Sequence, residues 1–179
     1  RYGDLVFSRD EPVDVTEKIH GSNARFTFVD GKMYAGSRKL WKLESETDPW
    51  WKVLAKYPQI RELCEGWPGW TVYGEIYGHQ DLKYGVSQGD YDFAVFDIRD
   101  HEGAFISPRG GDAVCTTWPT PQVPSFGTVL YNREALIELA SGESLLGHNI
   151  REGIVVRPLR VRYHDSIGRV ILKLVSPEY

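Results

Sequence analysis

Lys18 is the residue of this sequence whose type and position best suit covalent chemistry. It lies in the run Glu17-Lys18-Ile19-His20-Gly21-Ser22-Asn23, directly after the alternating residues 13–16. A lysine amine is a nucleophile in its neutral form, which packing at the end of a strand can favour. The plain alternative is a strand end followed by a Gly-Ser-Asn turn, with the lysine in water. Because short motifs also match by accident, the run alone leaves both interpretations open.

Four charged residues lie within otherwise apolar, strand-like runs: Glu75, Asp97, Glu152 and Lys173. A buried charge without a partner is costly, so we expect these residues to pair with one another, with a ligand or with a metal. Two carboxylates that converge on one cavity suit Mg²⁺, which shares its oxygen ligands with phosphates. A lysine nucleophile beside a metal-bound triphosphate is suited to phosphoryl or nucleotidyl transfer. One ion pair at a strand edge would explain any single charge, but it explains all four together poorly.

The elements that must position these residues form an α+β pattern, mainly antiparallel strands with a few helices. Asp30-Gly31 predicts a two-residue hairpin, so Lys18 is expected between two strands of one antiparallel sheet. Strands are expected at residues 13–19, 24–29, 32–37, 70–78, 91–98, 126–131, 154–156 and 170–175, with 103–107 as a hairpin partner. Helices are expected at residues 50–57, 59–64, 112–118 and 133–140, the last capped by Asn132.

The composition is that of a globular protein and limits the classes of function. The chain has 179 residues, of which 41% are hydrophobic and 26% charged. It contains no apolar run near the roughly 20 residues that a membrane-spanning helix requires. Cys64 and Cys115 are too few and too far apart for a disulfide framework or a zinc site, which fits a reducing compartment.

Charge gives no global signal for nucleic acid, since the formal net charge is −4. The segment 151–173 is nevertheless basic, and its six cations outnumber Glu152 and Asp165. These cations are Arg151, Arg157, Arg160, Arg162, Arg169 and Lys173. Such a stripe could follow a phosphate backbone, or it could be the solvated face of a strand.

Six motifs in order give the sequence a specific resemblance. They are Glu-Lys-Ile-His-Gly-Ser-Asn, Gly-Ser-Arg-Lys, Val-Tyr-Gly-Glu-Ile-Tyr-Gly, Phe-Ala-Val-Phe-Asp-Ile, Arg-Glu-Gly-Ile-Val-Val-Arg-Pro and Leu-Lys-Leu-Val-Ser, within residues 17–176. This order resembles the covalent nucleotidyltransferase superfamily. His20 and Asn23 resemble the nick-sealing RNA ligase 2 type within it. The implied fold is an antiparallel-sheet nucleotidyltransferase domain, an ATP-grasp-like ligase core with a few flanking helices.

The resemblance implies a reaction in three steps. Lys18 attacks the α-phosphate of ATP, AMP passes to a 5′-phosphate end, and a 3′-hydroxyl then displaces AMP. The implied cofactors are ATP and Mg²⁺ or Mn²⁺. The implied catalytic residues are Lys18, His20, Asn23 and Lys173. The implied nucleotide-binding residues are Glu17, Ile19, Arg38, Glu75, Phe96, Glu152 and Lys173.

The resemblance also implies particular roles for these residues. Phe96 would stack on adenine beside the backbone of Glu17, and Arg38 would contact the ribose or the polynucleotide end. Glu75 would bind the ribose or a metal, and Glu152 would bind a catalytic metal. His20 and Asn23 would contact phosphates, and Lys173 would neutralise the α-phosphate.

Two features depart from the family pattern. The last motif usually has a second lysine, where this chain has Val175, so Lys173 acts alone or Arg157 or Arg169 substitutes. Second, no further domain follows Tyr179. We therefore expect residues 1–179 to form a single adenylyltransferase domain, with any C-terminal domain outside this chain.

The leading hypothesis is an ATP-dependent RNA ligase that acts on RNA ends or nicked RNA/DNA duplexes. The enzyme is expected to be a monomer that does not bind a membrane. It is expected to act in the cytoplasm, either of its own cell or, if a virus encodes it, of the host cell. A DNA ligase or an mRNA-capping guanylyltransferase on the same fold is the first alternative. His20 and Asn23 argue against it, because those enzymes more commonly have aspartate and arginine there. A nucleotide-binding module without catalysis is the second alternative.

Overall fold

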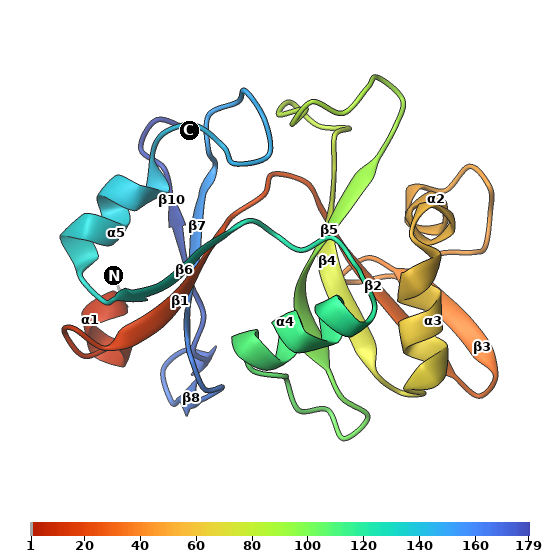
Figure 1. The fold of residues 1–179 in the computed structure, drawn as a ribbon, viewed down its shortest axis with the longest axis horizontal. Helices are drawn as coiled ribbons and strands as arrows, with labels where there is room; N and C mark the ends of the chain where they lie inside the picture. Colours follow the sequence, from red (N-terminus) through yellow and green to blue (C-terminus); the bar gives the residue numbers. More distant parts are fainter. Residues whose placement is uncertain (1) are drawn as a thin grey trace. The chain divides into compact units, whose positions relative to one another are not determined.

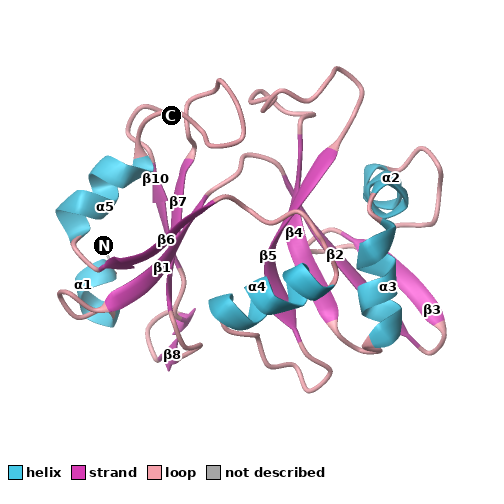
Figure 2. Ribbon diagram, viewed as in Figure 1, coloured by secondary structure: helices cyan, strands magenta, loops and turns pink. Residues whose placement is uncertain are grey.

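The computed structural model describes residues 2–179 and is an α+β fold built from antiparallel sheets with a few helices (Figures 1 and 2). This confirms the predicted fold class. The chain divides into two compact units. The first unit contains Arg1–Ile19 and Val123–Tyr179, and the second contains His20–Gln122. Lys18 therefore belongs to the first unit, and His20 begins the second.

The first unit is built on a four-stranded sheet in the order β10-β7-β1-β6, in which all neighbours are antiparallel. Its strands are β1 (Pro12–Glu17), β6 (Ser125–Leu130), β7 (Gly153–Pro158) and β10 (Leu172–Val175). Its helices are α1 (Gly3–Val6) and α5 (Arg133–Ala140), and β8 (Tyr163–His164) pairs with β9 (Gly168–Arg169). The side chain of Asn132 caps α5 by accepting from the Ala135 N–H at 3.0 Å, as predicted.

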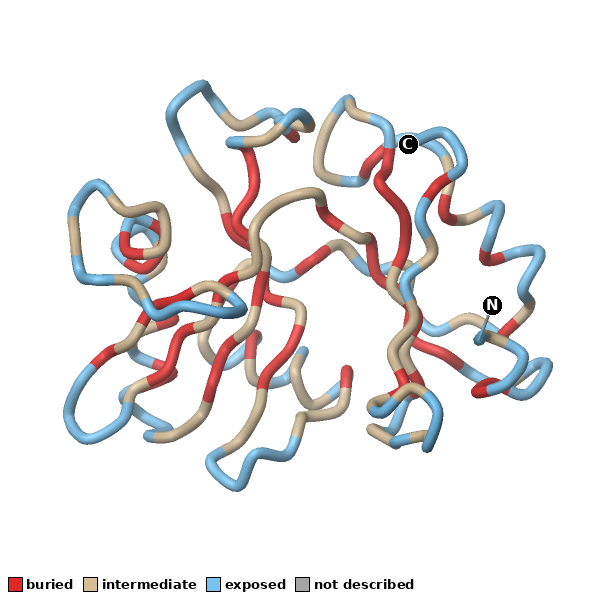
Figure 3. The backbone as a smooth tube through the Cα atoms, turned by 180° about the vertical axis from the view of Figure 1, so that it is seen from behind, coloured by how far each residue is buried: buried red, intermediate tan, exposed pale blue. Residues whose placement is uncertain are grey.

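The core of the first unit follows the period-two alternation of its central strands. Val13 and Val15 of β1 are fully buried beside Ile154 and Val156 of β7. Helix α5 contacts β7 and β10 and adds Leu136 to this cluster. In Figure 3 the buried stretches follow the strands. The opposite face of this sheet therefore carries Asp14 and Thr16 of β1, and by alternation Lys18.

The second unit is built on a four-stranded antiparallel sheet in the order β3-β2-β4-β5. Its strands are β2 (Ser22–Val29), β3 (Lys32–Gly36), β4 (Thr71–Tyr77) and β5 (Asp92–Arg99). Its helices are α2 (Pro49–Lys56), α3 (Pro58–Gly66) and α4 (Pro108–Thr117). Asp30 and Gly31 both have positive φ, 50° and 74°, which confirms the predicted two-residue hairpin between β2 and β3.

One face of this second sheet is covered by α2, α3 and α4, which contact β3, β2 and β5 respectively (Figure 2). Phe26 and Phe93 meet there edge to face at 5.4 Å. Cys64 and Cys115 are free and buried, which confirms that they pack as small apolar side chains. Burial raises the pKa of the Cys64 thiol to about 12. The functional residues therefore have to use the other face of the sheet.

A bulge in β5 determines where Phe96 points. Tyr73 pairs with Asp97 and Gly74 with Val95, so Phe96 is the extra residue between the two pairs. Val95 and Ile98 lie in the core cluster. The bulge therefore places Phe96 and Asp97 in succession on the face of the sheet away from the helices.

The predicted relationship of the strands around Lys18 is wrong. We expected the strands before and after it to be neighbours in one sheet, but β1 and β2 belong to different sheets. Strand β1 pairs on both edges with strands from the C-terminal part of the chain, β6 and β7. Local alternation does not encode pairing between segments so far apart in the chain. The sequence therefore suggested that the strands on either side of Lys18 share one sheet.

Three smaller differences concern segment ends. The expected hairpin partner at residues 103–107 forms a single bridge, between Arg99 and Phe105. The helix expected from Asp112 begins earlier, at Pro108, because Ser107 caps it by accepting from the Gly110 N–H. The strand expected at residues 170–175 begins at Leu172.

Much of the basic stripe at residues 151–173 serves the structure of the first unit. Arg151 is buried and donates to the carbonyl oxygens of Ser141 at 2.9 Å and Glu143 at 2.7 Å. Arg157 pairs with Asp14, and Arg162 with Glu11. A continuous solvated track for a phosphate backbone is therefore not formed by these arginines.

Candidate active site

Lys18 follows directly on β1 and is held there by backbone and side chain. Its N–H donates to the Gly153 carbonyl at 2.9 Å, which continues the β1–β7 ladder by one residue. Its ammonium donates to the carboxylate of Glu152, with which it forms an ion pair. The side chains are 21% and 11% exposed. This confirms part of the expectation for Glu152, since its charge is paired inside the fold.

Lys173 lies on the same face of the first sheet as Lys18. Lys173 pairs with Val155, and Val155 pairs with Thr16, so these three residues share one face of three adjacent strands. Lys18 lies two residues beyond Thr16 on that face. Lys173 is exposed, contrary to the expectation of a buried charge, because it lies on an edge strand.

Asp14 and Arg157 complete the polar side of this sheet. They are directly opposite in the register of β1 and β7, and Arg157 Nη2 donates to Asp14 Oδ2 at 2.7 Å. The two side chains are 12–13% exposed. Arg157 was one candidate to replace the lysine missing at Val175, and the structure commits its guanidinium to Asp14. Val175 itself is exposed.

Glu17 and Ile19 flank Lys18 and point into the first unit. Glu17 is 1% exposed, and its carboxylate accepts from the Ser144 hydroxyl and from the Leu145 N–H at 2.8 Å. Its own N–H donates to the Pro124 carbonyl at 2.8 Å. Ile19 is 4% exposed. These contacts fix the chain on both sides of Lys18 and occupy the carboxylate of Glu17 within the first unit.

In the second unit, three predicted residues share the face of the sheet away from the helices. Asn23 of β2 pairs with Glu75 of β4, and Glu75 pairs with Ala94 of β5. The bulge adds Phe96, which is partly exposed. An amide, a carboxylate and an aromatic ring therefore lie together on this face. The indole N–H of Trp50 donates to the Asn23 carbonyl at 3.1 Å and so supports the strand at this point.

The segment His20-Gly21-Ser22 is held by the loop at residues 78–91. The His20 N–H donates to the Tyr84 hydroxyl at 2.8 Å. Gln80 Nε2 donates to the Gly21 carbonyl at 2.9 Å and to Ser22 Oγ at 3.2 Å. A Cβ at Gly21 would lie 2.2 Å from the Ile76 carbonyl oxygen, so only glycine fits there. The motif after Lys18 is thus fixed in place by residues from one distant loop.

Tyr84 is buried, at 4% exposure, and has a positive φ of 52°. This conformation is strained for a bulky residue and persists where surrounding contacts determine it. Its ring packs edge to face on Tyr77 at 5.5 Å. Tyr84 and Gln80 were missed by the sequence reasoning, because residues 80–89 are mostly polar and contain glycine, a pattern that indicates a surface loop.

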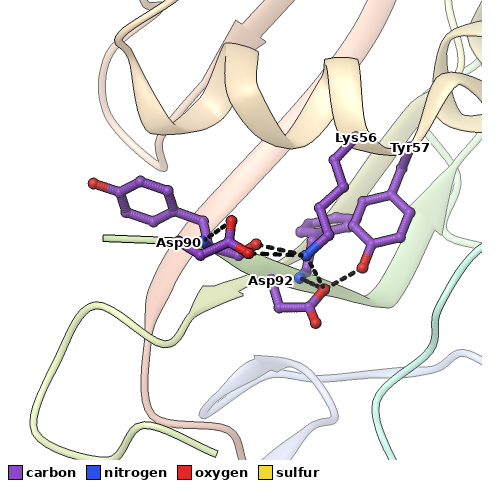
Figure 4. Close-up of polar contacts among 6 residues, drawn as sticks. Lys56, Tyr57, Asp90 and Asp92 are labelled. Carbon is purple, nitrogen blue, oxygen red and sulfur yellow. Dashed lines mark hydrogen bonds and ion pairs between the residues drawn. The ribbon is translucent and has the colours of Figure 1, made fainter. Parts of the chain in front are cut away.

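The far end of the same loop is tied to the helices of this unit. Figure 4 shows Lys56 and Tyr57 reaching from the end of α2 toward Asp90 and Asp92. Lys56 Nζ lies 3.6 Å from Asp92 Oδ1, and Tyr57 donates its hydroxyl to the same oxygen. Burial and the neighbouring Asp92 raise the pKa of Tyr57, so the phenol keeps its proton for this bond. The loop is therefore anchored at both of its ends.

Arg38 is exposed and follows β3. It is not among the residues whose strand pairing places them beside Asn23 and Glu75.

His79 contacts Ser22 Oγ at 3.1 Å, and burial together with Lys83 and His20 lowers its pKa. His79 is therefore neutral at pH 7. A cavity of about 860 Å³ in the first unit is lined by residues such as Phe7, Glu11 and Arg162. It contains none of the predicted site residues.

Each unit supplies a single carboxylate of the type that binds a magnesium ion together with a nucleotide. Among residues 2–179 no group of three or more histidine, cysteine, aspartate or glutamate side chains is arranged to hold a metal. Mg²⁺ commonly takes one or two carboxylates and completes its shell with phosphates and water. Glu152 and Glu75 are carboxylates of that kind, whereas a dedicated protein cage is not present in the described part of the chain.

The antiparallel sheets with their few helices form the fold of RNA ligase nucleotidyltransferase domains. Solved structures of Naegleria gruberi RNA ligase variants share it. A variant with ATP and Mn gives a TM-score of 0.81, and an apo variant gives 0.82. Each is 22% identical and is matched over 96% of this chain and 51% of its own length. The chain thus spans about half the length of these relatives.

The family itself is identified by sequence. The profile of the RNA ligase family matches residues 11–175, so the chain belongs to this family. A comparison with curated protein sequences gives no match. Within residues 2–179, none of the helices has the length and apolar character required to cross a membrane.

Proposed function

We propose that this chain is the adenylyltransferase module of an ATP-dependent RNA ligase, with residues 1–179 acting as one functional domain. The observation that carries the proposal is the ion pair of Lys18 with Glu152 at the end of β1, in a chain of the RNA ligase family. A lysine nucleophile needs a fixed position and a group that can take its proton. The backbone hydrogen bonds of Glu17 and Lys18 fix the position of the lysine. The Glu152 carboxylate already accepts a hydrogen bond from its side chain.

The proposed first step joins Lys18 to AMP. The Glu152 carboxylate first takes a proton from the Lys18 ammonium, which frees the Nζ lone pair. The lone pair attacks the α-phosphorus of ATP, the N–P bond forms, and the bond to the bridging oxygen breaks. The second proton lost from Nζ leaves with the pyrophosphate. Lys173, on the same sheet face, neutralises the negative charge on the α-phosphate oxygens as it develops. The product is a lysyl-AMP phosphoramidate.

The second unit supplies recognition in this proposal. Phe96 stacks on the adenine, and a flat ring serves this purpose without hydrogen bonds. Glu75 and Asn23, paired across β2 and β4, contact the ribose and the phosphates. His20 assists departure of pyrophosphate, and Arg38 contacts the ribose or the polynucleotide end. Glu17 and Ile19 line the adenine through their backbone.

Mg²⁺ or Mn²⁺ fits this proposal as a partner of the nucleotide phosphates. Glu152 and Glu75 would hold it, and it would supply neutralisation of phosphate charge. The Naegleria gruberi ligase variants with ATP and Mn or with AMP and Mn support this choice of cofactors. The carboxylates of Glu152 and Glu75 are consistent with such an ion, because Mg²⁺ commonly binds one or two carboxylates together with phosphates.

The later steps pass AMP to a 5′-phosphate end and join that end to a 3′-hydroxyl. The family supports RNA as the substrate. A monomer acting in the cytoplasm, of a cell or of a virus's host, is the proposed setting. The two free, buried cysteines support a reducing compartment.

The proposal is tested by incubating the protein with α-³²P-labelled ATP and Mg²⁺ and measuring the label that survives denaturation. We expect labelling of the wild type and of Lys52→Ala, an exposed lysine used as a matched control. We expect none in Lys18→Ala. Labelling by GTP alone would favour a capping guanylyltransferase, and no labelling by any nucleotide would favour a binding module without catalysis.

A further inference from the structure

An exposed tryptophan is stacked on an arginine in the second unit, apart from the residues assigned to ATP. The Arg25 guanidinium carbon lies 3.9 Å from the centroid of the Trp41 ring. Trp41 is nevertheless 48% exposed. One face of the indole is therefore covered by a cation, while much of the residue remains open to solvent. The exposed part of the ring is therefore a flat apolar surface on which another ring could stack.

Trp41 is exposed but rigidly held. Residues 37–40 form a tight turn in which the Ser37 N–H donates to the Leu40 carbonyl at 2.8 Å. The chain then returns along β3, where Gly36 bridges to Trp41 and the Lys42 N–H donates to the Ala35 carbonyl at 2.9 Å. A Cβ at Gly36 would lie 2.7 Å from the Trp41 ring, so glycine permits this close approach. A pre-organised ring loses little conformational entropy when a ligand stacks on it.

The surroundings of Trp41 are basic and aromatic. Tyr34 lies 5.7 Å from Trp41 between ring centroids, and Lys32 lies over Tyr34 at 5.5 Å. Residues 37–43 carry three cations and no acid, although Glu44 and Glu46 follow them. These cations are Arg38, Lys39 and Lys42. Because the whole chain has a net charge of −4, a cationic segment of this kind is a local feature.

The Trp41 platform, which we define as Arg25, Tyr34, Trp41 and Lys39, continues the sheet face that carries Asn23 and Glu75. Arg25 pairs with Gly36 across β2 and β3, and it lies two residues beyond Asn23 on the same strand. Alternation therefore places Arg25 and Asn23 on the same side. A polynucleotide that meets the predicted site residues on this face would extend along the sheet toward Trp41.

We propose that the Trp41 platform binds an unpaired nucleotide of a single-stranded RNA segment, with the base stacked on the free face of Trp41 and phosphates near Lys39. Aromatic rings and flanking cations are the usual means of binding single-stranded nucleic acid without sequence preference. Arg25 on the covered face supports the ring by cation–π contact. This inference rests on the proposed function, because it assigns a position to the RNA substrate of that site.

The test is RNA binding measured without ATP. The fluorescence anisotropy of a labelled single-stranded RNA of about ten nucleotides reports affinity, and stacking on one base predicts about a tenfold weaker Kd for Trp41→Ala. Trp41→Phe keeps a stacking face and should lose much less. Trp67→Ala is the matched control, because Trp67 is also exposed, at 43%, but packs with Trp70 and Trp118. Equal losses in the two alanine variants would overturn the proposal.

Two further measurements separate stacking from folding and from catalysis. Lys39→Gln should lower the slope of log Kd against log salt by about 0.7, the value for one phosphate contact on a single strand. A photoreactive 4-thiouridine RNA should crosslink to the wild type at Trp41, and crosslinks confined to other segments would contradict the proposal even if Trp41→Ala does not fold.

The outcomes for this inference and for the proposed function are distinct. Self-labelling with ATP should be unchanged in Trp41→Ala, whose ring has no assigned role in adenylylation. If the wild type is not labelled but binds RNA through Trp41, the ligase proposal fails and the platform stands. If labelling occurs but the wild type binds no RNA at all, or if Trp41→Ala binds it as tightly, the platform is wrong.

Discussion

Lys18 donates a hydrogen bond to the carboxylate of Glu152, a residue 134 positions away in the chain, and the two form an ion pair at the end of β1. The backbone repeats this contact, because the Lys18 N–H donates to Gly153, the next residue after Glu152. The pairing of β1 with β7 therefore sets the register of both backbone and side chains. One strand pair brings the predicted nucleophile to Glu152.

Replacing Glu152 with Gln should slow self-labelling with ATP by about a hundredfold, the lower range for losing a positioned proton acceptor. The amide keeps the shape of the side chain but accepts no proton at neutral pH. The rate of ³²P incorporation measures the effect. Glu143→Gln, at an exposed carboxylate of the same unit, is the control. A Glu152→Gln variant labelled as fast as the wild type would exclude the role of this carboxylate.

Lys173→Ala should slow self-labelling by about a hundredfold, the usual effect of losing one group that stabilises developing charge. A lysine placed at Val175 should restore part of this loss. Residues 173 and 175 share one face of β10, and Val175 is 55% exposed, so a lysine fits there at little cost to stability. The double variant Lys173→Ala/Val175→Lys is compared with Lys173→Ala alone. Absence of any rescue would mean that charge on this face does not reach the phosphate.

Tyr84→Phe should reduce the rate of self-labelling several-fold without unfolding the protein. The variant removes the acceptor of the His20 N–H, and an unmade hydrogen bond at a partly buried group costs about 1–3 kcal/mol. Thermal melting should show a small fall in Tm for a loss of this size. Tyr163→Phe serves as the control because Tyr163 is 65% exposed in the other unit. Equal labelling rates in Tyr84→Phe and wild type would show that the loop does not position this motif.

Phe96→Ala should raise the KM for ATP about tenfold, since stacking on one base contributes about 1–3 kcal/mol. Phe96→Tyr keeps the aromatic face and should leave KM near that of the wild type. The bulge makes this prediction specific, because it places Phe96 on the same side of the sheet as Glu75 rather than in the core. A fall in Tm with unchanged KM in Phe96→Ala would indicate a packing role instead.

The ion pair of Glu11 with Arg162 should make the free energy of unfolding depend on pH in the acidic range. The hydrogen bond from Arg162 lowers the pKa of Glu11 below its ordinary value of 4.5, partly offset by burial. The folded pKa is lower than the unfolded one, so this stabilisation is complete above the unfolded pKa and is lost as pH falls through the folded pKa.

Urea unfolding of Glu11→Gln and wild type at several pH values measures this effect. Because the pair is partly exposed, the wild type should be more stable by at most about 1 kcal/mol at pH 7. The difference should decrease as the pH falls below 4.5 and vanish below the folded pKa of Glu11. A difference that does not change with pH would mean that the carboxylate charge is not involved.

The sequence by itself determined most of the local structure and the identity of the chemistry. The Asp30-Gly31 hairpin, the Asn132 cap of α5 and the period-two strands are encoded by neighbouring residues, and these were predicted. Order and spacing of the motifs identified the family. Lys18 was predicted from the motif at residues 17–23, and Glu152 because a charge inside an apolar run is visible without coordinates.

Tertiary structure alone decided which strands are neighbours and where the side chains point. Strands β1 and β2 flank Lys18 in the chain, yet they lie in different sheets because β1 pairs with β6 and β7. The bulge at Phe96, the exposure of Lys173 and the burial of Arg151 all follow from pairing or packing over long sequence distances. Tyr84 has no local signal at all. Local propensity acts over a few residues, whereas register and burial depend on contacts between segments that the sequence pattern does not specify.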